Sequence, residues 1–139
     1  FKQYIQQVKK NASILGEVLM SNGIDIVTGG TDSHMVLVDL RSKNVTGKDA
    51  EESLERAGMT CNKNGVANDP NPPTITSGIR LGSPAATTRG FKDEEFKFIG
   101  DKISTVINAL SSSNSNISMT ESSILKEVTE LCSKFPIYQ

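Results

Sequence analysis

Apolar residues near the start of the chain recur at steps of three and four, which is the spacing of one face of an amphipathic helix. The positions are Phe1, Tyr4, Ile5, Val8, Ala12, Leu15, Val18 and Leu19. Ser21-Asn22-Gly23 follows them, and glycine suits the left-handed residue just beyond the end of a helix. The pattern therefore predicts a helix that ends at Ser21-Asn22-Gly23.

Two apolar stretches after this helix predict strands. Ile24–Val27 is the first stretch, and Gly29-Gly30 breaks the chain after it. Met35–Leu40 is apolar at nearly every position, which is typical of a strand covered on both faces. Arg41–Asn44 then turns the chain.

A second helix is predicted where Thr46 is followed three residues later by Asp49, because this spacing resembles a capping box. The apolar side of this helix consists of Ala50, Leu54 and Ala57. Gly58 ends the helix. We expect Met59–Cys61 to form a short strand beyond it.

Two more apolar patterns predict helices in the last third of the chain. Their positions are Phe96, Ile99, Ile103, Val106, Ile107 and Leu110 for one, and Ile124, Leu125, Val128, Leu131 and Cys132 for the other. Ser111–Ser118 predicts a polar linker between them, and Pro136 prevents the last helix from continuing. Short strands among helices predict a single α/β domain over residues 1–139, a small sheet packed with helices mostly on one face.

Composition excludes several classes of partner. The chain of 139 residues carries 15 Lys+Arg against 16 Asp+Glu, so it lacks the basic character of a nucleic-acid or membrane-surface protein. No apolar run approaches the roughly 20 residues of a membrane span. Cys61 and Cys132 could form a disulfide, but two cysteines in such a chain are more often free thiols. We therefore expect a cytoplasmic protein. Because Phe1 already lies within a helical pattern, we also expect a piece of a longer protein.

The stretch Asn62–Gly90 has an unusual balance of charge. It contains Arg80 and Arg89 but a single carboxylate, Asp69. Arg80 is flanked by apolar residues and glycines, and a guanidinium offers paired donors that match a carboxylate or a phosphate. Arg80 therefore either binds an anionic ligand or pairs with a distant acid of the fold.

The sequence contains no self-sufficient catalytic set and no metal site. His34 is the only histidine, which excludes a histidine cluster, and with Asp32 nearby it is either a polarised base or, as we favour, a structural residue. Ser77 and Ser83 lack the pattern of a nucleophile elbow. The cysteines lack the spacing of metal ligands. We predict no catalytic residue and no metal ligand in this chain.

The chain also contains several short sequence blocks whose residues and order resemble those of a known enzyme family. They are Gly29–His34, Asn62-Lys63-Asn64, Asn68-Asp69-Pro70, Thr76–Ala85, Thr88–Phe91 and Phe135–Tyr138. Together they resemble the C-terminal domain of serine hydroxymethyltransferase, along essentially the whole chain. The resemblance implies the small C-terminal domain of a fold-type-I pyridoxal-phosphate enzyme.

The resemblance also implies a function. Enzymes of this family interconvert serine and tetrahydrofolate with glycine and methylenetetrahydrofolate, in one-carbon metabolism and amino-acid biosynthesis, as homodimers or larger homo-oligomers. By resemblance, Arg80 binds the carboxylate of serine or glycine, and Asn64 contacts the pteridine of tetrahydrofolate. Arg89 and His34 are candidates for supporting these contacts. From the residues alone, we would favour Asn64 as a turn-forming residue ahead of Gly65.

The cofactor itself is not expected to be held by this piece. In the family, pyridoxal phosphate is bound by a lysine in a threonine-rich segment of a larger preceding domain. None of the eleven lysines here has that setting, so we expect the isolated piece to be inactive. Two alternatives remain: a stand-alone domain that binds a small carboxylate, and the equivalent domain of another pyridoxal-phosphate enzyme such as threonine aldolase.

Overall fold

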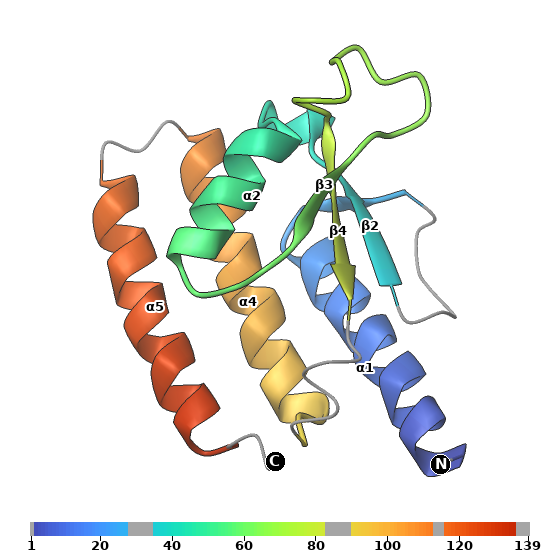
Figure 1. The fold of residues 1–139 in the computed structure, drawn as a ribbon, viewed down its shortest axis with the longest axis vertical. Coiled ribbons are helices and arrows are strands. Elements are labelled where there is room, and N and C mark those ends of the chain that lie inside the picture. Colours follow the sequence, from blue (N-terminus) through green and yellow to red (C-terminus); the bar gives the residue numbers. More distant parts are fainter. Residues whose placement is uncertain (1, 28–34, 83–89, 113–115, 136–139) are drawn as a thin grey trace.

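The computed structural model describes residues 2–27, 35–82, 90–112 and 116–135 (Figure 1). Its elements, in chain order, are α1 (Lys2–Ser21), β1 (Asp25–Ile26), β2 (Met35–Asp39), the 3-10 helix η1 (Arg41–Lys43), α2 (Gly47–Arg56), β3 (Asn62–Asn64), β4 (Gly78–Gly82), α4 (Asp93–Ser111) and α5 (Ile117–Ser133). His34 and Arg89 lie outside the described residues, and so do the glycines expected to interrupt the chain before β2.

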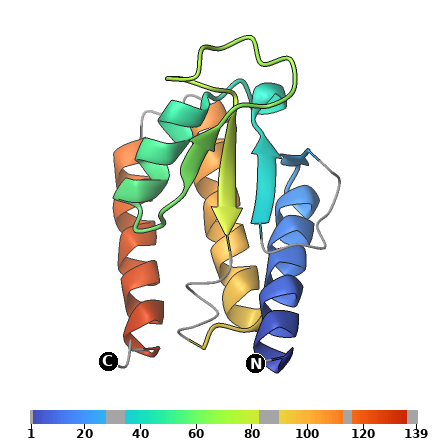
Figure 2. The same cartoon turned by 45° about the vertical axis from the view of Figure 1, so that its right-hand side comes forward.

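The four strands form one antiparallel sheet in the order β1-β2-β4-β3. Helices α1 and α4 pack against each other behind the sheet (Figure 2), and α2 packs against β3 and β4. Helix α5 contacts α4 and α2. The predicted α/β fold, a small sheet with helices on one face, is confirmed.

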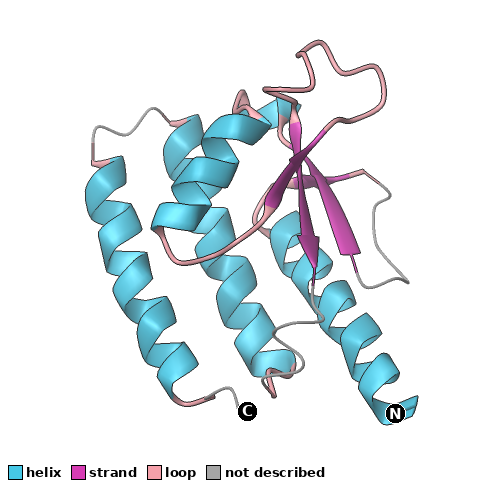
Figure 3. Cartoon of the chain, viewed as in Figure 1, coloured by secondary structure: helices cyan, strands magenta, loops and turns pink. Residues whose placement is uncertain are grey.

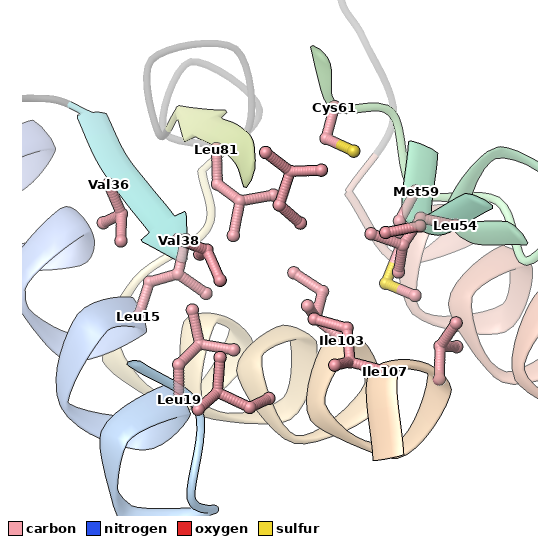
Figure 4. Packing of buried hydrophobic residues seen from close by; sticks show 14 of the residues in the cluster. Leu15, Leu19, Val36, Val38, Leu54, Met59, Cys61, Leu81, Ile103 and Ile107 are labelled. Atoms are coloured by element: carbon pink, nitrogen blue, oxygen red, sulfur yellow. The ribbon is translucent and has the colours of Figure 1, made fainter. Parts of the chain in front are cut away.

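The core lies between the sheet and the helices (Figure 4). Alternate side chains of β2 and β4 enter it, and the register pairs Val36 with Leu81 and Val38 with Ile79. The helices contribute Leu15, Leu19, Ile103 and Ile107. Burial of these side chains is the main favourable contribution to the stability of the domain.

The prediction that Met35–Leu40 is covered on both faces is wrong. Val36 and Val38 are buried, but Met35, Leu37 and Asp39 are only half-buried. Within the described residues, the helices cover one face of the sheet and leave the other open. Met35 and Leu37 lie on the open face. Because they are apolar too, the stretch Met35–Leu40 is apolar at nearly every position although only one of its faces is covered.

The strand expected at Met59–Cys61 forms instead at β3 (Asn62–Asn64). Met59 and Cys61 are buried, so their apolar character reflects the core below α2 rather than strand pairing. Pairing with β4 begins only at Asn62, which lies opposite Arg80. Three polar residues were not recognised as a strand because β-propensity depends strongly on context.

The linker expected at Ser111–Ser118 is also shorter than predicted. Helix α4 includes Ser111, and α5 begins at Ile117. The Ser112 hydroxyl donates to the carbonyl of Ala109 at 3.0 Å, which shows how serine is accommodated at a helix end.

The local signals at helix ends are confirmed. Asp49 N donates to Thr46 Oγ1 at 3.1 Å, so Thr46 caps α2 as its spacing predicted. Gly23 has a φ of 83° directly after α1, and Gly58 has a φ of 88° after α2. Both glycines therefore occupy the left-handed conformation that side chains disfavour.

Candidate functional site

The open face of the sheet brings the two main predicted site residues together. Ile79 and Leu81 are buried in the core, and successive strand residues point to opposite faces, so Arg80 points to the open face. Arg80 lies directly opposite Asn62 in the register, and Asn64 lies opposite Gly78. Arg80 and Asn64 are thus diagonal neighbours on one face, a relationship that places residues roughly 7–8 Å apart.

Arg80 has no anionic partner in the described part of the chain. Its side chain is exposed, and none of the hydrogen bonds or ion pairs among described residues involves its guanidinium. The alternative of a structural arginine paired with a distant acid therefore has no support there. A solvent-facing guanidinium on a backbone held by strand pairing is suited to binding the carboxylate of a ligand.

The carboxylate of Asp39, which lies on the same sheet, is already occupied. Arg41 Nε donates to Asp39 Oδ1 at 3.0 Å, and Arg41 Nη2 donates to Asp39 Oδ2 at 2.6 Å. These bonds from Arg41 hold the pKa of Asp39 below its usual value. Asp39 is thereby kept ionised and turned toward Arg41.

Asn64 is the last residue of β3, at the point where the chain leaves the sheet. Its side chain is half-buried, and its Nδ2 donates to the carbonyl of Gly65 at 2.9 Å. That local bond agrees with a role in the turn, but no donor among the described residues binds its Oδ1. Asn64 can therefore shape the chain and still offer an acceptor to a ligand.

The loop of residues 65–77 joins β3 to β4 and projects beyond the end of the sheet (Figure 3). Asp69 organises it by accepting bonds from the backbone N–H of Val66 (3.2 Å), Asn71 (2.9 Å) and Ser77 (2.8 Å), and from the Ser77 hydroxyl (2.7 Å). These donors, the Ser77 hydroxyl foremost, lower the pKa of Asp69 to about 2. Sequence reasoning missed this role. The available signal was an aspartate two residues before Asn71 in a proline-rich stretch, the pattern of an Asx-turn.

Helix α2 holds both the loop and the edge strand. Gly47 N donates to the carbonyl of Thr76 at 3.0 Å, and Lys48 N donates to the carbonyl of Ile75 at 2.9 Å. A Cβ on Gly47 would lie 2.1 Å from Thr76 Oγ1, so only glycine permits this approach. At the other end of the loop, the Glu51 carboxylate accepts from the backbone N–H of Lys63 at 2.8 Å.

The lysines of the chain do not fit a pyridoxal-phosphate anchor. All eleven lie within the described residues, and none is buried. Lys63, the lysine nearest the site in sequence, forms an ion pair with Glu51 at 3.5 Å. A Schiff-base lysine functions with a lowered pKa in an enclosed site, and this chain provides no such setting.

Other kinds of site were sought among the described residues. They contain no group of three His, Cys, Asp or Glu side chains arranged to hold a metal ion. The helices in this part of the chain are all too short or too polar to cross a bilayer. A half-open cavity of about 250 Å³ is lined by apolar side chains, including Leu54, Leu81 and Phe96, and by both cysteines. Because Leu81 faces the core, this cavity lies across the sheet from Arg80.

Comparisons with known proteins show which sequences resemble this chain. A family model described as serine hydroxymethyltransferase matches residues 1–103. A serine hydroxymethyltransferase of Paramagnetospirillum magneticum is 58% identical over 139 residues, covering 100% of this chain and 33% of the relative. A serine hydroxymethyltransferase of Rhodospirillum centenum is 57% identical over 138 residues, covering 99% and 32%. A serine hydroxymethyltransferase 2 of Burkholderia pseudomallei is 54% identical over 138 residues, with the same coverage. The chain spans about a third of the length of these curated relatives.

Proposed function

This chain belongs to the serine hydroxymethyltransferase family, and we propose that it is the C-terminal domain of an enzyme that interconverts serine and tetrahydrofolate with glycine and methylenetetrahydrofolate. Because the chain spans about a third of its relatives, the activity belongs to the full-length protein. The role of this domain is to recognise substrates, and it supplies no catalytic residue.

The observation that carries the proposal is the guanidinium of Arg80, which lies on the open face of the sheet and has no acidic partner among the described residues. The buried neighbours Ile79 and Leu81 (0% and 5% exposed) fix the backbone beneath it. We assign to Arg80 the carboxylate of serine or glycine, held by two parallel hydrogen bonds. Such a grip fixes the orientation of the amino acid, and orientation alone can lower a reaction barrier substantially.

Asn64 is the proposed contact for the pteridine of tetrahydrofolate. Its amide carries both a donor and an acceptor, as the edge of a heterocycle requires. Its diagonal position beside Arg80 on the sheet would place the two substrates next to each other. Arg89 and His34 remain proposed supporting residues on sequence grounds alone.

Pyridoxal phosphate would be anchored by a lysine elsewhere in the full-length protein, and when bound it supplies the electron sink for cleavage. We therefore propose that the isolated chain is inactive. By the family resemblance we also propose a homodimer or larger homo-oligomer. Cys61 and Cys132 are not joined in a disulfide, which suits the reducing cytoplasm that we propose as its location.

The test is the substitution Arg80→Lys in the full-length protein, with Arg56→Lys as the control. Lysine keeps the charge but loses the planar fork. We expect serine and glycine affinity to fall by about tenfold or more, while the absorption of the bound cofactor is retained. Arg56 lies on α2 and points to α5, so its variant should bind serine normally. Serine affinity within about twofold of the unsubstituted enzyme, less than ~0.5 kcal/mol, would disprove the role of Arg80.

A further inference from the structure

The loop of residues 65–77 is the covalent connection between the two proposed substrate contacts, and it is folded around one carboxylate. Val66, which donates to Asp69, lies two residues after Asn64. Ser77, which donates to Asp69 through both its N–H and its hydroxyl, lies three residues before Arg80. Asp69 thus joins the exit of β3 to the entry of β4.

The surrounding donors are arranged for a carboxylate and no other side chain of that size. Three of the four bonds to Asp69 come from backbone N–H groups, which cannot rotate away. An asparagine at this position has one acceptor oxygen, and its amide N–H₂ would face donors. The Ser77 hydroxyl is held from its other side by Asn71 Nδ2 at 2.8 Å, so it already has a fixed orientation.

Arg80 and Asn64 depend on this loop to different degrees. Arg80 is the middle residue of β4, paired with Leu37 on one side and Asn62 on the other. Asn64 ends β3, and its side chain is bonded to Gly65, the first residue of the loop. A change in the loop should therefore displace Asn64 while the sheet keeps Arg80 in place.

We propose that Asp69 is a positioning residue for the folate side of the site: it fixes the loop so that Asn64 presents its amide to the pteridine, while Arg80 is held independently by the sheet. The inference rests on the proposed function of Arg80 and Asn64. It assigns to the loop a role in specificity for the second substrate.

The test compares three substitutions with Asn64→Ala in the full-length protein. Asp69→Asn replaces one of the two acceptor oxygens with an amide N–H₂. Ser77→Ala removes the hydroxyl bond to Asp69 and the bond from Asn71 Nδ2, but it leaves the three backbone bonds to Asp69. Asp25→Asn is the matched control, since Asp25 is exposed on β1 and accepts no hydrogen bond among the described residues. The readouts are the KM for tetrahydrofolate, the KM for serine, and the folate-independent cleavage of a bulky 3-hydroxy amino acid. Thermal unfolding is recorded in parallel.

We expect Asp69→Asn to raise the KM for tetrahydrofolate by about tenfold and Ser77→Ala by about threefold. The KM for serine and the folate-independent reaction should stay within about twofold of the unsubstituted enzyme, as all readouts should in Asp25→Asn. If Asp69 only stabilises the fold, its substitution should lower the unfolding temperature and the fraction of active enzyme. It should not raise the KM for tetrahydrofolate relative to the KM for serine. If Asp69→Asn does not fold, Ser77→Ala tests the proposal: its KM for tetrahydrofolate should rise while its KM for serine does not.

Three results would overturn the inference in distinguishable ways. If Asn64→Ala raises the KM for tetrahydrofolate but neither loop variant does, Asp69 does not position Asn64, and the proposed function stands. If Asn64→Ala leaves the KM for tetrahydrofolate unchanged, the proposed folate contact is wrong, and the positioning role of Asp69 is wrong too. Equal increases in both KM values in the loop variants would show that the loop supports the whole domain.

Discussion

Glu121 of α5 and Arg56 of α2 form an ion pair that joins the two helices, with Arg56 Nε 2.9 Å from Glu121 Oε1. Glu121 is only 5% exposed, and it also accepts a short hydrogen bond from the Ser53 hydroxyl. A buried carboxylate is tolerated only when it is paired and hydrogen-bonded. This pair is therefore the main polar attachment of α5 to α2.

Arg56→Ala should destabilise the chain, because it leaves the Glu121 carboxylate buried without its charged donor. Hydrogen bonds to charged groups are worth about 1.5–3 kcal/mol, and a loss of that size is expected in urea unfolding. The control is Lys97→Ala, which breaks the solvent-exposed pair of Lys97 with Glu94 at 3.4 Å. That change should cost less than ~0.5 kcal/mol. Equal costs for the two variants would contradict the assignment.

Glu121→Gln should remove part of the pH dependence of stability. The hydrogen bond from Arg56, with a further one from Ser53, holds the pKa of Glu121 below the ordinary value of 4.5. A lowered folded-state pKa contributes stability above the unfolded value, and this stability is lost as the pH falls through the folded-state pKa. The variant should be less stable than the parent at pH 7, and the gap should narrow below about pH 4.5. The measurement is the urea midpoint of parent and variant from neutral to acidic pH. A difference between the two midpoints that stays constant with pH would show that Glu121 does not contribute to the pH dependence of stability.

The two thiols should differ in reactivity. Burial, reinforced by Glu51 and Glu55, raises the pKa of Cys61 to about 12, and the thiolate is the reactive form. Cys132 is only half-buried. At mildly alkaline pH, iodoacetamide should therefore label Cys132 before Cys61, as peptide mass spectrometry can measure. In denaturant the two rates should converge. Labelling of Cys61 at the rate of Cys132 in the folded chain would count against the burial of Cys61.

Asn64→Ala tests the proposed contact between Asn64 and tetrahydrofolate. In the full-length protein, loss of a neutral hydrogen-bonding side chain costs roughly 0.5–1.5 kcal/mol, and more where a buried partner is left unpaired. Apparent affinity for tetrahydrofolate should fall by about tenfold. Cleavage of a bulky 3-hydroxy amino acid, which needs no folate, should be nearly unchanged.

Two other outcomes of this test would contradict the proposal. Equal damage to both reactions would show that Asn64 only shapes the turn before Gly65. An unsubstituted enzyme that is indifferent to folate would contradict the proposed tetrahydrofolate-dependent activity. Asn62→Ala is a suitable companion variant, because Asn62 lies opposite Arg80 in the register and is not a proposed folate contact.

The open face of the sheet could be predicted only in part. The outward direction of Arg80 follows from its buried neighbours Ile79 and Leu81 and from the alternation of strand side chains. That Arg80 has no acidic partner in the described part of the chain is a property of the fold, since the carboxylate of Asp39 on the same face is bonded to Arg41 instead. The loop around Asp69 could not be predicted because its donors, Val66 and Ser77, are brought together only when the loop closes.

The sequence by itself determined the helices and those ends that carry a cap signal, because periodicity, the Thr46 cap and the left-handed Gly23 act over short stretches of chain. It did not determine the ends of α4 and α5 at the polar linker. It also determined membership of the family, through blocks spread along the chain. Only the tertiary structure decided that β2 has an open face, that β3 begins at Asn62, and that Asn64 lies diagonal to Arg80. The physical reason is that sheet register and helix coverage depend on contacts between residues far apart in the chain, which local patterns of apolar and polar residues do not record.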